Sequence, residues 1–310
     1  MRSREPSALI QVRCVAVADA GVDAASAAPA EAPPTLEQRR AIAEGFVELA
    51  TEPAGVTWTE VDAGGVGGLW ADAVGGRVDR VVQYLHGGGY MVGSAASHRR
   101  LGGHLAKAVG CRVLLVDYGR SPENAHPGPV NESAAVYRWL LEQGVLPSHL
   151  AIGGDSSGGG LALATLLKLR ADSLPQPAGG VALSAWVDLE ALGETMTSNV
   201  GRDLVVASER LKAYAEVFLA GADGRDPLAA PLYGDYRGVC PLYLQVGGAE
   251  LLLDDSRRVA ETARQAGVEV DVDVFPDMQH VFQMNVGNLA QADDAIARIG
   301  AWLRQRLGLA

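Results

Sequence analysis

The sequence predicts an α/β fold in which a mostly parallel central sheet of about eight strands is flanked by helices. Short, nearly continuous apolar segments alternate with amphipathic segments along most of the chain, which is typical of parallel strands joined by covering helices. The first strands are separated only by glycine-rich turns, so we expect them to pair antiparallel. A length of 310 residues is compatible with one large core.

Residues 1–34 end in a stretch rich in Ala and Pro and show no sustained period. We therefore predict a loosely ordered N-terminal extension there and a single domain over residues 35–310. The first helix is predicted at 35–50, because Thr35 is a candidate N-cap and Gln38 follows three residues later.

The remaining elements follow from the hydrophobic pattern. Apolar runs bounded by turn residues predict strands, and apolar residues at a helical period predict helices. The predicted strands are 56–61, 66–71, 80–85, 112–118, 149–154, 179–185, 241–247 and 268–275. The predicted helices after the first are 97–109, 131–143, 157–170, 208–220, 256–267 and 293–307. The stretch between the strands at 179–185 and 241–247 is long for a connection, and excursions of that size are often lids.

Composition excludes several classes of partner. A formal net charge of -11 argues against nucleic acid and anionic lipid, which are bound by clustered Lys and Arg. No apolar run approaches the ~20 residues that span a bilayer, so we expect no membrane insertion. The three cysteines match neither a metal spacing nor a disulfide framework, which favours a reducing, cytoplasmic location.

The stretch IGGDSSGGG, residues 152–160, lies between a predicted strand and a predicted helix. It lacks the lysine of a phosphate-binding P-loop and the spacing of a dinucleotide fingerprint. It does contain GxSxG, from Gly154 to Gly158, which is the pattern of a nucleophile held on a sharp strand-to-helix turn. Glycine is needed beside such a turn because a Cβ would collide with the strand and the helix. Ser156 is therefore the candidate nucleophile.

A second glycine-rich stretch, YLHGGGY at residues 84–90, follows another apolar strand. Successive glycines leave backbone N–H groups unshielded, and such groups can bind the oxyanion of a tetrahedral intermediate. We predict an oxyanion hole formed by the amides of Gly88, Gly89 and Ser157.

These motifs and their spacing resemble the bacterial branch of the hormone-sensitive lipase family of α/β-hydrolases, from about residue 36 onward. Three further segments are similar to the family's DYRLAPExxFPA, SPWxDL and DPxxSPL motifs: VDYGRSPENAHPG (116–128), SAWVDL (184–189) and DPLAAPLYGD (226–235). The resemblance implies an α/β-hydrolase fold with a helical cap formed by about 35–50 and 187–235.

The other two members of a catalytic triad should follow the serine in the order acid, then histidine. His280 is the only histidine after Ser156, and its place before the last helix suits a general base. The run VGGAELLLDDS offers Glu250, Asp254 and Asp255 as the acid. Aligned without gaps on the family's DPLxDE motif, Glu250 falls on the catalytic acid, and Asp254 is the rival.

Together these features predict a serine carboxylesterase that hydrolyses short- to medium-chain or other small-molecule carboxylic esters, lactones included. The chemistry requires no metal or cofactor, and the predicted partner is the ester substrate. The residues predicted to line the substrate pocket are Tyr90, Trp186, Tyr214 and Phe218.

Three questions stay open at the level of sequence. The same triad could serve an acyltransferase, in which an alcohol replaces water. Some plant members of the superfamily are small-molecule receptors that have lost a triad residue, so a non-catalytic binding protein is a second alternative. The resemblance also implies a homodimer paired through the last strand, near 268–275.

Overall fold

The computed structural model describes residues 33–309. The predicted N-terminal extension therefore lies, apart from its last two residues, outside the described residues. The division of the chain into an extension and a single domain stays a prediction.

The described chain forms one eight-stranded sheet in the order β1-β2-β4-β3-β5-β6-β7-β8. β1 pairs with β2 and β2 pairs with β4 antiparallel, and every other neighbouring pair is parallel. The predicted fold class is thus confirmed. The strands are β1 (Val56–Asp62), β2 (Gly67–Ala73), β3 (Arg77–Leu85), β4 (Cys111–Val116), β5 (Leu150–Asp155), β6 (Gly179–Leu183), β7 (Leu242–Gly247) and β8 (Val270–Phe275).

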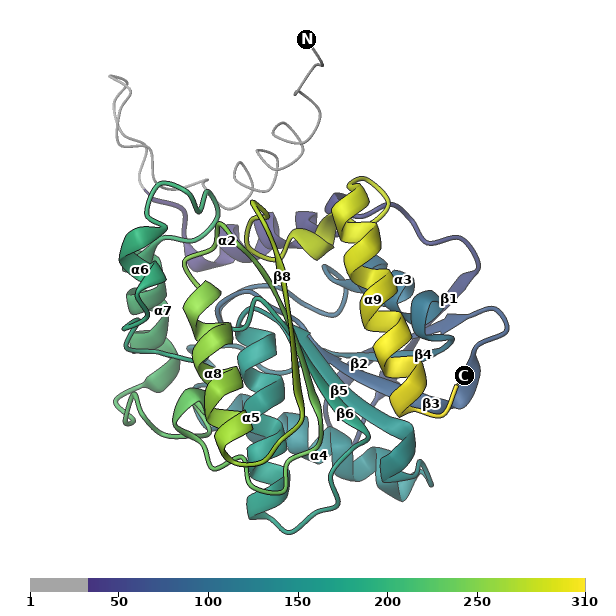
Figure 1. The fold of residues 1–310 in the computed structure, drawn as a ribbon. Coiled ribbons are helices and arrows are strands. Elements are labelled where there is room, and N and C mark those ends of the chain that lie inside the picture. The colour runs from purple at the N-terminus through teal and green to yellow at the C-terminus, as the bar shows by residue number, and fades with distance from the viewer. Residues whose placement is uncertain (1–32, 310) are drawn as a thin grey trace.

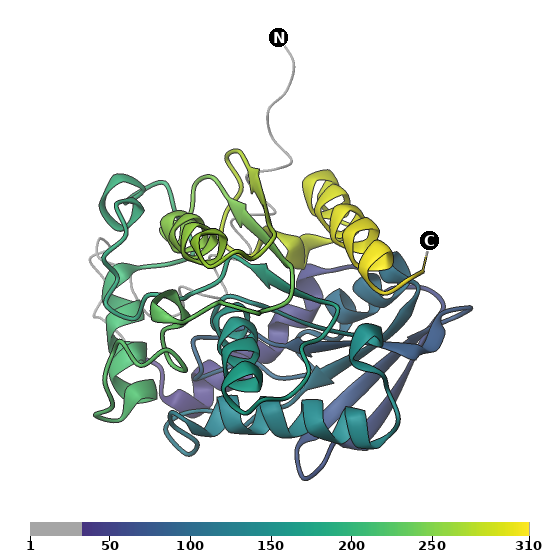
Figure 2. The same ribbon diagram turned by 60° about the horizontal axis from the view of Figure 1, so that its bottom comes forward.

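Helices cover both faces of the sheet (Figures 1 and 2). On one face α3 packs against α9 and over β2 and β4, and on the other α5 packs between the sheet and α4, with α8 over β7 and β8. These helices are α3 (Arg99–Val109), α4 (Gly128–Glu142), α5 (Ser157–Ala171), α8 (Leu253–Gln265) and α9 (Ala290–Arg306).

α5 is the central helix, and most of its residues are buried, from Ser157 to Leu169. A helix surrounded by other elements needs apolar residues on all sides, which explains why its sequence shows no polar face. Its position fixes the turn before it, because the helix begins directly after residue 156.

The first predicted helix is shorter than expected. α2 (Leu36–Glu44) begins at the predicted N-cap, where Thr35 and Gln38 form a capping box. It ends at Gly45, a poor helix former, and the chain continues as the 3-10 helix η1 (Gly45–Leu49). The segment therefore changes from α-helix to 3-10 helix where one continuous helix was predicted.

Two helices and a long loop lie at the end of the sheet to which the parallel strands point. The predicted excursion contains α6 (Thr195–Ser198) and α7 (Ser208–Leu219), and these lie on the same side of the molecule as α2 in Figure 1. Within residues 33–309, no helix is long and apolar enough to cross a membrane.

Three short 3-10 helices complete the description: η2 (Pro147–His149), η3 (Pro231–Tyr233) and η4 (Phe282–Asn285). η4 follows the loop after β8 and packs against α9. β8 is one of the two edge strands of the sheet. The dimer predicted through it stays a prediction.

Candidate active site

Ser156 lies in the turn between β5 and α5 and has a backbone φ of 52°. This left-handed conformation is unusual for a residue with a side chain and marks a strained turn. The Ser156 N–H donates to the carbonyl of Leu183 at the end of β6, at 2.8 Å. The turn therefore holds the serine side chain at the carboxyl edge of the sheet.

The glycines around the serine are required by close backbone approach. A Cβ at Gly154 would overlap the carbonyl of Gly158, and a Cβ at Gly158 would overlap the carbonyl of Leu85. Strand β3, strand β5 and the first turn of α5 thus meet at distances that only glycine allows. This is the collision that the sequence pattern predicts.

His280 contacts both other predicted triad residues. Its Nε2 lies 2.9 Å from Ser156 Oγ, and its Nδ1 lies 2.9 Å from Glu250 Oε2. A carboxylate can only accept, so Nδ1 carries the proton and Nε2 is left to accept from the serine hydroxyl. The side chain of Glu250 is fully buried and that of His280 is 9% exposed.

The buried pair has perturbed proton affinities. Burial alone would lower the pKa of the His280 imidazole, but the hydrogen bond and charge of Glu250 raise it above its ordinary value. Burial raises the pKa of the Glu250 carboxyl, although His280 and Ser184 act in the opposite direction. A histidine with raised basicity beside a serine hydroxyl is suited to proton abstraction.

The rival acid, Asp254, does not contact His280. It lies in the first turn of α8, where its Oδ2 accepts from the Thr195 backbone N–H at 3.1 Å and its Oδ1 lies 3.3 Å from the Arg257 guanidinium. Glu250 is in the loop before that helix and points to the histidine instead.

Ser184 is a further polar residue of the site that the sequence analysis missed. Its buried hydroxyl donates to Glu250 Oε1 at 2.7 Å and accepts from the Val281 N–H at 3.1 Å. It therefore contacts the acid and the backbone directly after the base. Its position at the end of β6, inside the SAWVDL segment, is the only signal that could have pointed to it.

Two of the three residues predicted to form the oxyanion hole, Gly88 and Gly89, line the cavity beside Ser156, whereas Ser157 is buried at the start of α5. Gly88 and Gly89 have φ values of 118° and 62°, and both line the same cavity as Ser156. Among the described residues, none accepts a hydrogen bond from the N–H of Gly88, Gly89 or Ser157. The N–H groups of Gly88 and Gly89, in the cavity wall with Ser156, therefore have no acceptor among the described residues that would compete with a substrate oxygen.

A buried aspartate adjacent to the nucleophile supports the glycine-rich loop. Asp155 Oδ1 accepts from the Tyr84 hydroxyl at 2.9 Å and the Gly87 N–H at 3.1 Å, and it lies 3.4 Å from His98 Nε2. Burial would raise the pKa of this carboxyl, but the charge and hydrogen bond of His98 lower it. Sequence analysis did not assign Asp155 a role.

A cavity of about 460 Å³ opens onto Ser156 and His280. Its walls are mainly apolar side chains from four regions that are far apart in sequence: the N-terminal helical segment, residues 88–92, residues 205–214, and residues 280–284. The apolar lining residues include Ile42, Phe46, Leu49, Val92, Val205, Val206, Leu211 and Met284.

Two of the four predicted pocket residues line this cavity and two do not. Trp186 and Tyr214 are in its wall, and the ring of Tyr214 lies directly over Gly89. The prediction for Tyr90 and Phe218 is wrong. Their rings stack on each other with centroids 3.7 Å apart, and each residue is only 1% exposed. Phe218 lies on the core-facing side of α7, whereas Tyr214, one turn earlier, faces the cavity.

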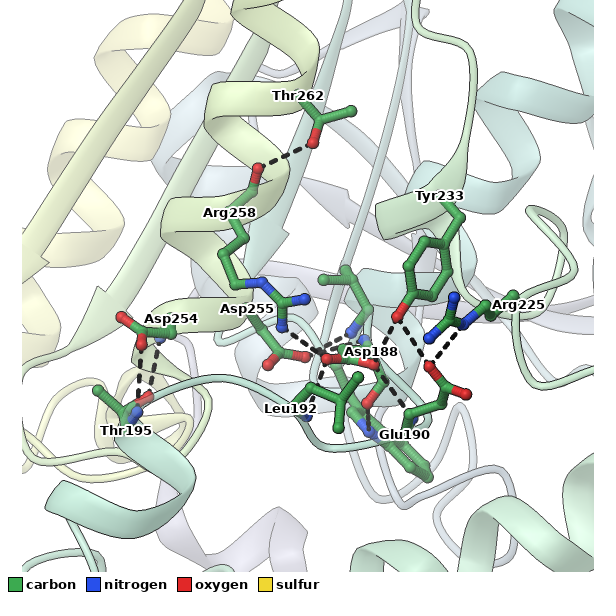
Figure 3. Close-up of polar contacts among 12 residues, drawn as sticks. Asp188, Glu190, Leu192, Thr195, Arg225, Tyr233, Asp254, Asp255, Arg258 and Thr262 are labelled. Atoms are coloured by element: carbon green, nitrogen blue, oxygen red, sulfur yellow. Dashed lines mark hydrogen bonds and ion pairs between the residues drawn. The ribbon is translucent and has the colours of Figure 1, made fainter.

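A second cluster of carboxylates lies beneath the loop that follows Trp186 (Figure 3). Asp188 is ion-paired with Arg258 at 2.5 Å, and Asp255 accepts from the backbone N–H groups of Val187 and Asp188 at 2.9 and 3.0 Å. These contacts join α8 to the loop. Within residues 33–309, no group of three or more His, Cys, Asp or Glu side chains is arranged to hold a metal ion.

Comparison with known proteins agrees with this geometry. Residues 82–284 match a family described as having the alpha/beta hydrolase fold. An acetyl-hydrolase of Streptomyces hygroscopicus is 42% identical over 229 residues, which cover 74% of this chain and 77% of the relative. An esterase of Acinetobacter venetianus is 35% identical over 221 residues, which cover 71% and 73%.

Solved structures extend the similarity over nearly the whole chain. A crystal structure of an esterase from the bacterial hormone-sensitive lipase family is 41% identical with a TM-score of 0.90, covering 99% of this chain and 100% of the other. A hormone-sensitive lipase from a metagenome library is 35% identical, with the same TM-score and coverage. This chain therefore belongs to the bacterial hormone-sensitive lipase family of α/β hydrolases, as its motifs predict.

Proposed function

We propose that the protein is a serine carboxylesterase that hydrolyses short- to medium-chain or other small carboxylic esters through an acyl-enzyme. Ester hydrolysis is the activity that the names of its relatives share. The observation that carries the finer proposal is the chain of contacts Ser156–His280–Glu250, with 2.9 Å at each step.

The proposed mechanism begins with proton transfer. His280 Nε2 takes the proton from the Ser156 hydroxyl as its oxygen attacks the ester carbonyl, and Glu250 stabilises the imidazolium that forms. The imidazolium then gives that proton to the leaving alcohol as the C–O bond of the ester breaks, leaving an acyl-enzyme. His280 then takes a proton from water as the water oxygen attacks the acyl group, and it gives that proton to Ser156 Oγ as the acyl–serine bond breaks and the acid is released.

Negative charge develops on the carbonyl oxygen in both tetrahedral intermediates. The unpaired amides of Gly88, Gly89 and Ser157 would bind that oxygen, and the N-terminus of α5 faces the same charge. Ser157 contributes twice, because its hydroxyl also accepts from the Tyr90 N–H at 3.2 Å. This contact ties the glycine-rich loop to the start of α5.

The cavity supports a substrate of modest size. A volume of about 460 Å³ is within the roughly 300–1,000 Å³ of pockets that hold small molecules. The mainly apolar wall fits an acyl chain, and Ser156 and His280 provide polar groups at the reacting end. Lactones of similar size remain substrates to test.

The proposal is tested with p-nitrophenyl esters of graded acyl length, from acetyl to dodecanoyl. We expect activity to be highest for short or medium chains and Ser156→Ala to lower kcat by about 10³-fold or more while the protein stays folded. Near-normal hydrolysis by that variant would contradict the nucleophile assignment.

The same assay separates the two alternatives. An acyltransferase would convert an added alcohol to a new ester faster than it releases free acid, as product analysis would show. A binding protein that has lost catalysis would bind esters without turnover. A cytoplasmic location, the absence of a cofactor and the homodimer stay predictions.

A further inference from the structure

We infer that the cap segment, residues 199–206, positions both the acid and the base of the triad from the wall of the substrate cavity, with Asp203 as its central residue. This inference rests on the proposed function, because it concerns the same Ser156, His280 and Glu250. The segment joins α6 to α7, and none of its residues belongs to the motifs recognised in the sequence.

The cap segment contacts the loop that carries the acid at two points. Asp203 Oδ2 accepts from the Leu251 backbone N–H at 2.8 Å, and Asn199 Nδ2 donates to the backbone carbonyl of Glu250 at 2.7 Å. Both side chains are buried, with Asp203 8% and Asn199 3% exposed. Both polar groups of the peptide bond between Glu250 and Leu251 are thus bound to the cap segment.

The same segment contacts the loop that carries the base. Gln279, the residue directly before His280, accepts from the Leu204 N–H through Oε1 at 2.7 Å and donates to the Arg202 carbonyl through Nε2 at 3.0 Å. This paired contact restrains the backbone from which the imidazole projects. The acid and the base therefore share one neighbour.

The segment also forms part of the cavity wall. Asp203 Oδ1 accepts from the N–H groups of Val205 and Val206 at 2.8 and 2.9 Å, and both valines line the cavity. One carboxylate therefore binds the wall with one oxygen and the acid loop with the other. Displacement of the wall would be transmitted to Glu250 over a few bonds.

The negative charge of Asp203, like its hydrogen bonds, supports the proposed role of His280 as a base. Three carboxylates face His280 and raise its pKa against the effect of burial: Glu250 most, then Asp203 and Asp155. The neighbouring cation, Arg202, is about half exposed and points toward the exposed Asp277, 3.9 Å away. An ionised Asp203 therefore helps His280 to act as a base.

An amide cannot replace this carboxylate. Asp203 accepts three backbone N–H bonds with its two oxygens, whereas asparagine has one oxygen and a donor group. In Asp203→Asn the NH₂ would face either the Leu251 N–H or those of the two valines. The variant therefore breaks the hydrogen bonds either to the acid loop or to the cavity wall. It also removes the negative charge and leaves the volume of the side chain nearly unchanged.

The test compares Asp203→Asn with Asp277→Asn as a matched control. Asp277 lies three residues before His280, is exposed, and has a φ of 60°, a conformation that asparagine tolerates. Both variants lose one carboxylate in this region. Asp277→Asn weakens only an exposed ion pair with Arg202 at 3.9 Å, whereas Asp203→Asn breaks buried hydrogen bonds to the acid loop or to the cavity wall. The measurements are kcat and KM for p-nitrophenyl butyrate, the pH dependence of kcat/KM, and the melting temperature.

For Asp203→Asn we expect kcat to fall about 10- to 100-fold, because small displacements of catalytic groups have effects of this size. We also expect the acidic limb of the profile, on which activity rises as His280 loses its proton, to move to lower pH by roughly half a unit to one unit. The control variant should match the wild type in kcat and in the position of this limb. A folded Asp203→Asn variant with wild-type kcat and an unchanged limb would overturn the inference, even if its melting temperature were lower.

If Asp203→Asn does not fold, Asn199→Ala provides the test. It removes the donor to the Glu250 carbonyl, and we expect kcat to fall about threefold to tenfold; a wild-type kcat would overturn the inference. Failure of the proposed function is distinguishable, because the wild-type protein would then hydrolyse no ester at all.

Discussion

Glu250 and Asp255 are two buried carboxylates five residues apart that have different partners. Glu250 lies in the loop after β7 and binds His280 and Ser184. Asp255 lies in the first turn of α8 and binds the backbone of residues 187 and 188, with the ion pair of Asp188 and Arg258 beside it (Figure 3). Neither residue is exposed to solvent.

Burial alone therefore does not identify a catalytic carboxylate. Burial raises the pKa of both groups, that of Asp255 to about 7. What distinguishes them is that Glu250 reaches the serine through a titratable base, whereas Asp255 binds backbone amides that cannot titrate. We therefore expect the first region to control turnover and the second to control stability.

The largest difference in kcat between the two regions is expected when each of these carboxyls is replaced by an amide. Glu250→Gln should lower kcat about 10²- to 10⁴-fold, because the amide cannot stabilise the imidazolium or fix its tautomer. Asp255→Asn should leave kcat within about threefold, since its one oxygen can accept both backbone N–H bonds that Asp255 Oδ2 accepts now. Steady-state kinetics on the folded variants measures both kcat values. Equal losses of kcat in the two variants would contradict the distinction between the two carboxylates.

A smaller effect on kcat is expected from a change at Ser184, which tests the contacts around Glu250. Ser184→Ala removes the hydroxyl that joins Glu250 to the Val281 amide, and we expect kcat to fall about tenfold, as for loss of one hydrogen bond to a charged group. Ser256→Ala is the matched control, because that buried hydroxyl on α8 has no hydrogen-bond partner among the described residues. Similar kcat values for the two variants would show that the Ser184 contact does not assist turnover.

The smallest effect on turnover is expected from the titration of Asp255. That titration instead makes the stability of the folded protein depend on pH. The folded-state pKa of Asp255 is raised from 3.8 to about 7, so the folded chain holds this proton more tightly than the unfolded chain. Its stabilising contribution is complete below about pH 4 and is lost as pH rises to about 7.

Asp255→Asn removes that titration. Relative to the wild type, the variant should therefore gain about 2–3 kcal/mol in free energy of unfolding between about pH 5 and about pH 8. Urea unfolding at the two pH values measures the difference. Parallel pH dependence in the two proteins would show that Asp255 does not titrate in this range.

Much of the fold and the central contacts could be predicted because their signals are local. The strand-turn-helix context and the two glycines around Ser156 are adjacent in sequence, and a single histidine follows them. The pairing of Glu250 with His280 required only the order of elements at one edge of a parallel sheet. Family motifs supplied the choice between Glu250 and Asp254.

The residues that the sequence did not reveal act through partners far away in the chain. Ser184 binds the amide of residue 281 and Asp203 that of residue 251, and a single polar residue in a loop forms no pattern. The error at Phe218 has a related cause, because the sequence of α7 does not show which aromatic faces the cavity. Tyr90 is buried because its ring stacks on Phe218, more than 100 residues away in the chain.

The most direct test of the central claim is to label the protein with a fluorophosphonate and map the modified peptide by mass spectrometry. Our account predicts one modified residue, Ser156, and labelling at least about 10²-fold slower in His280→Ala, because the base then no longer activates the hydroxyl. A label on another residue, or equally fast labelling without the imidazole, would contradict the claim that this serine and this histidine form the reactive pair.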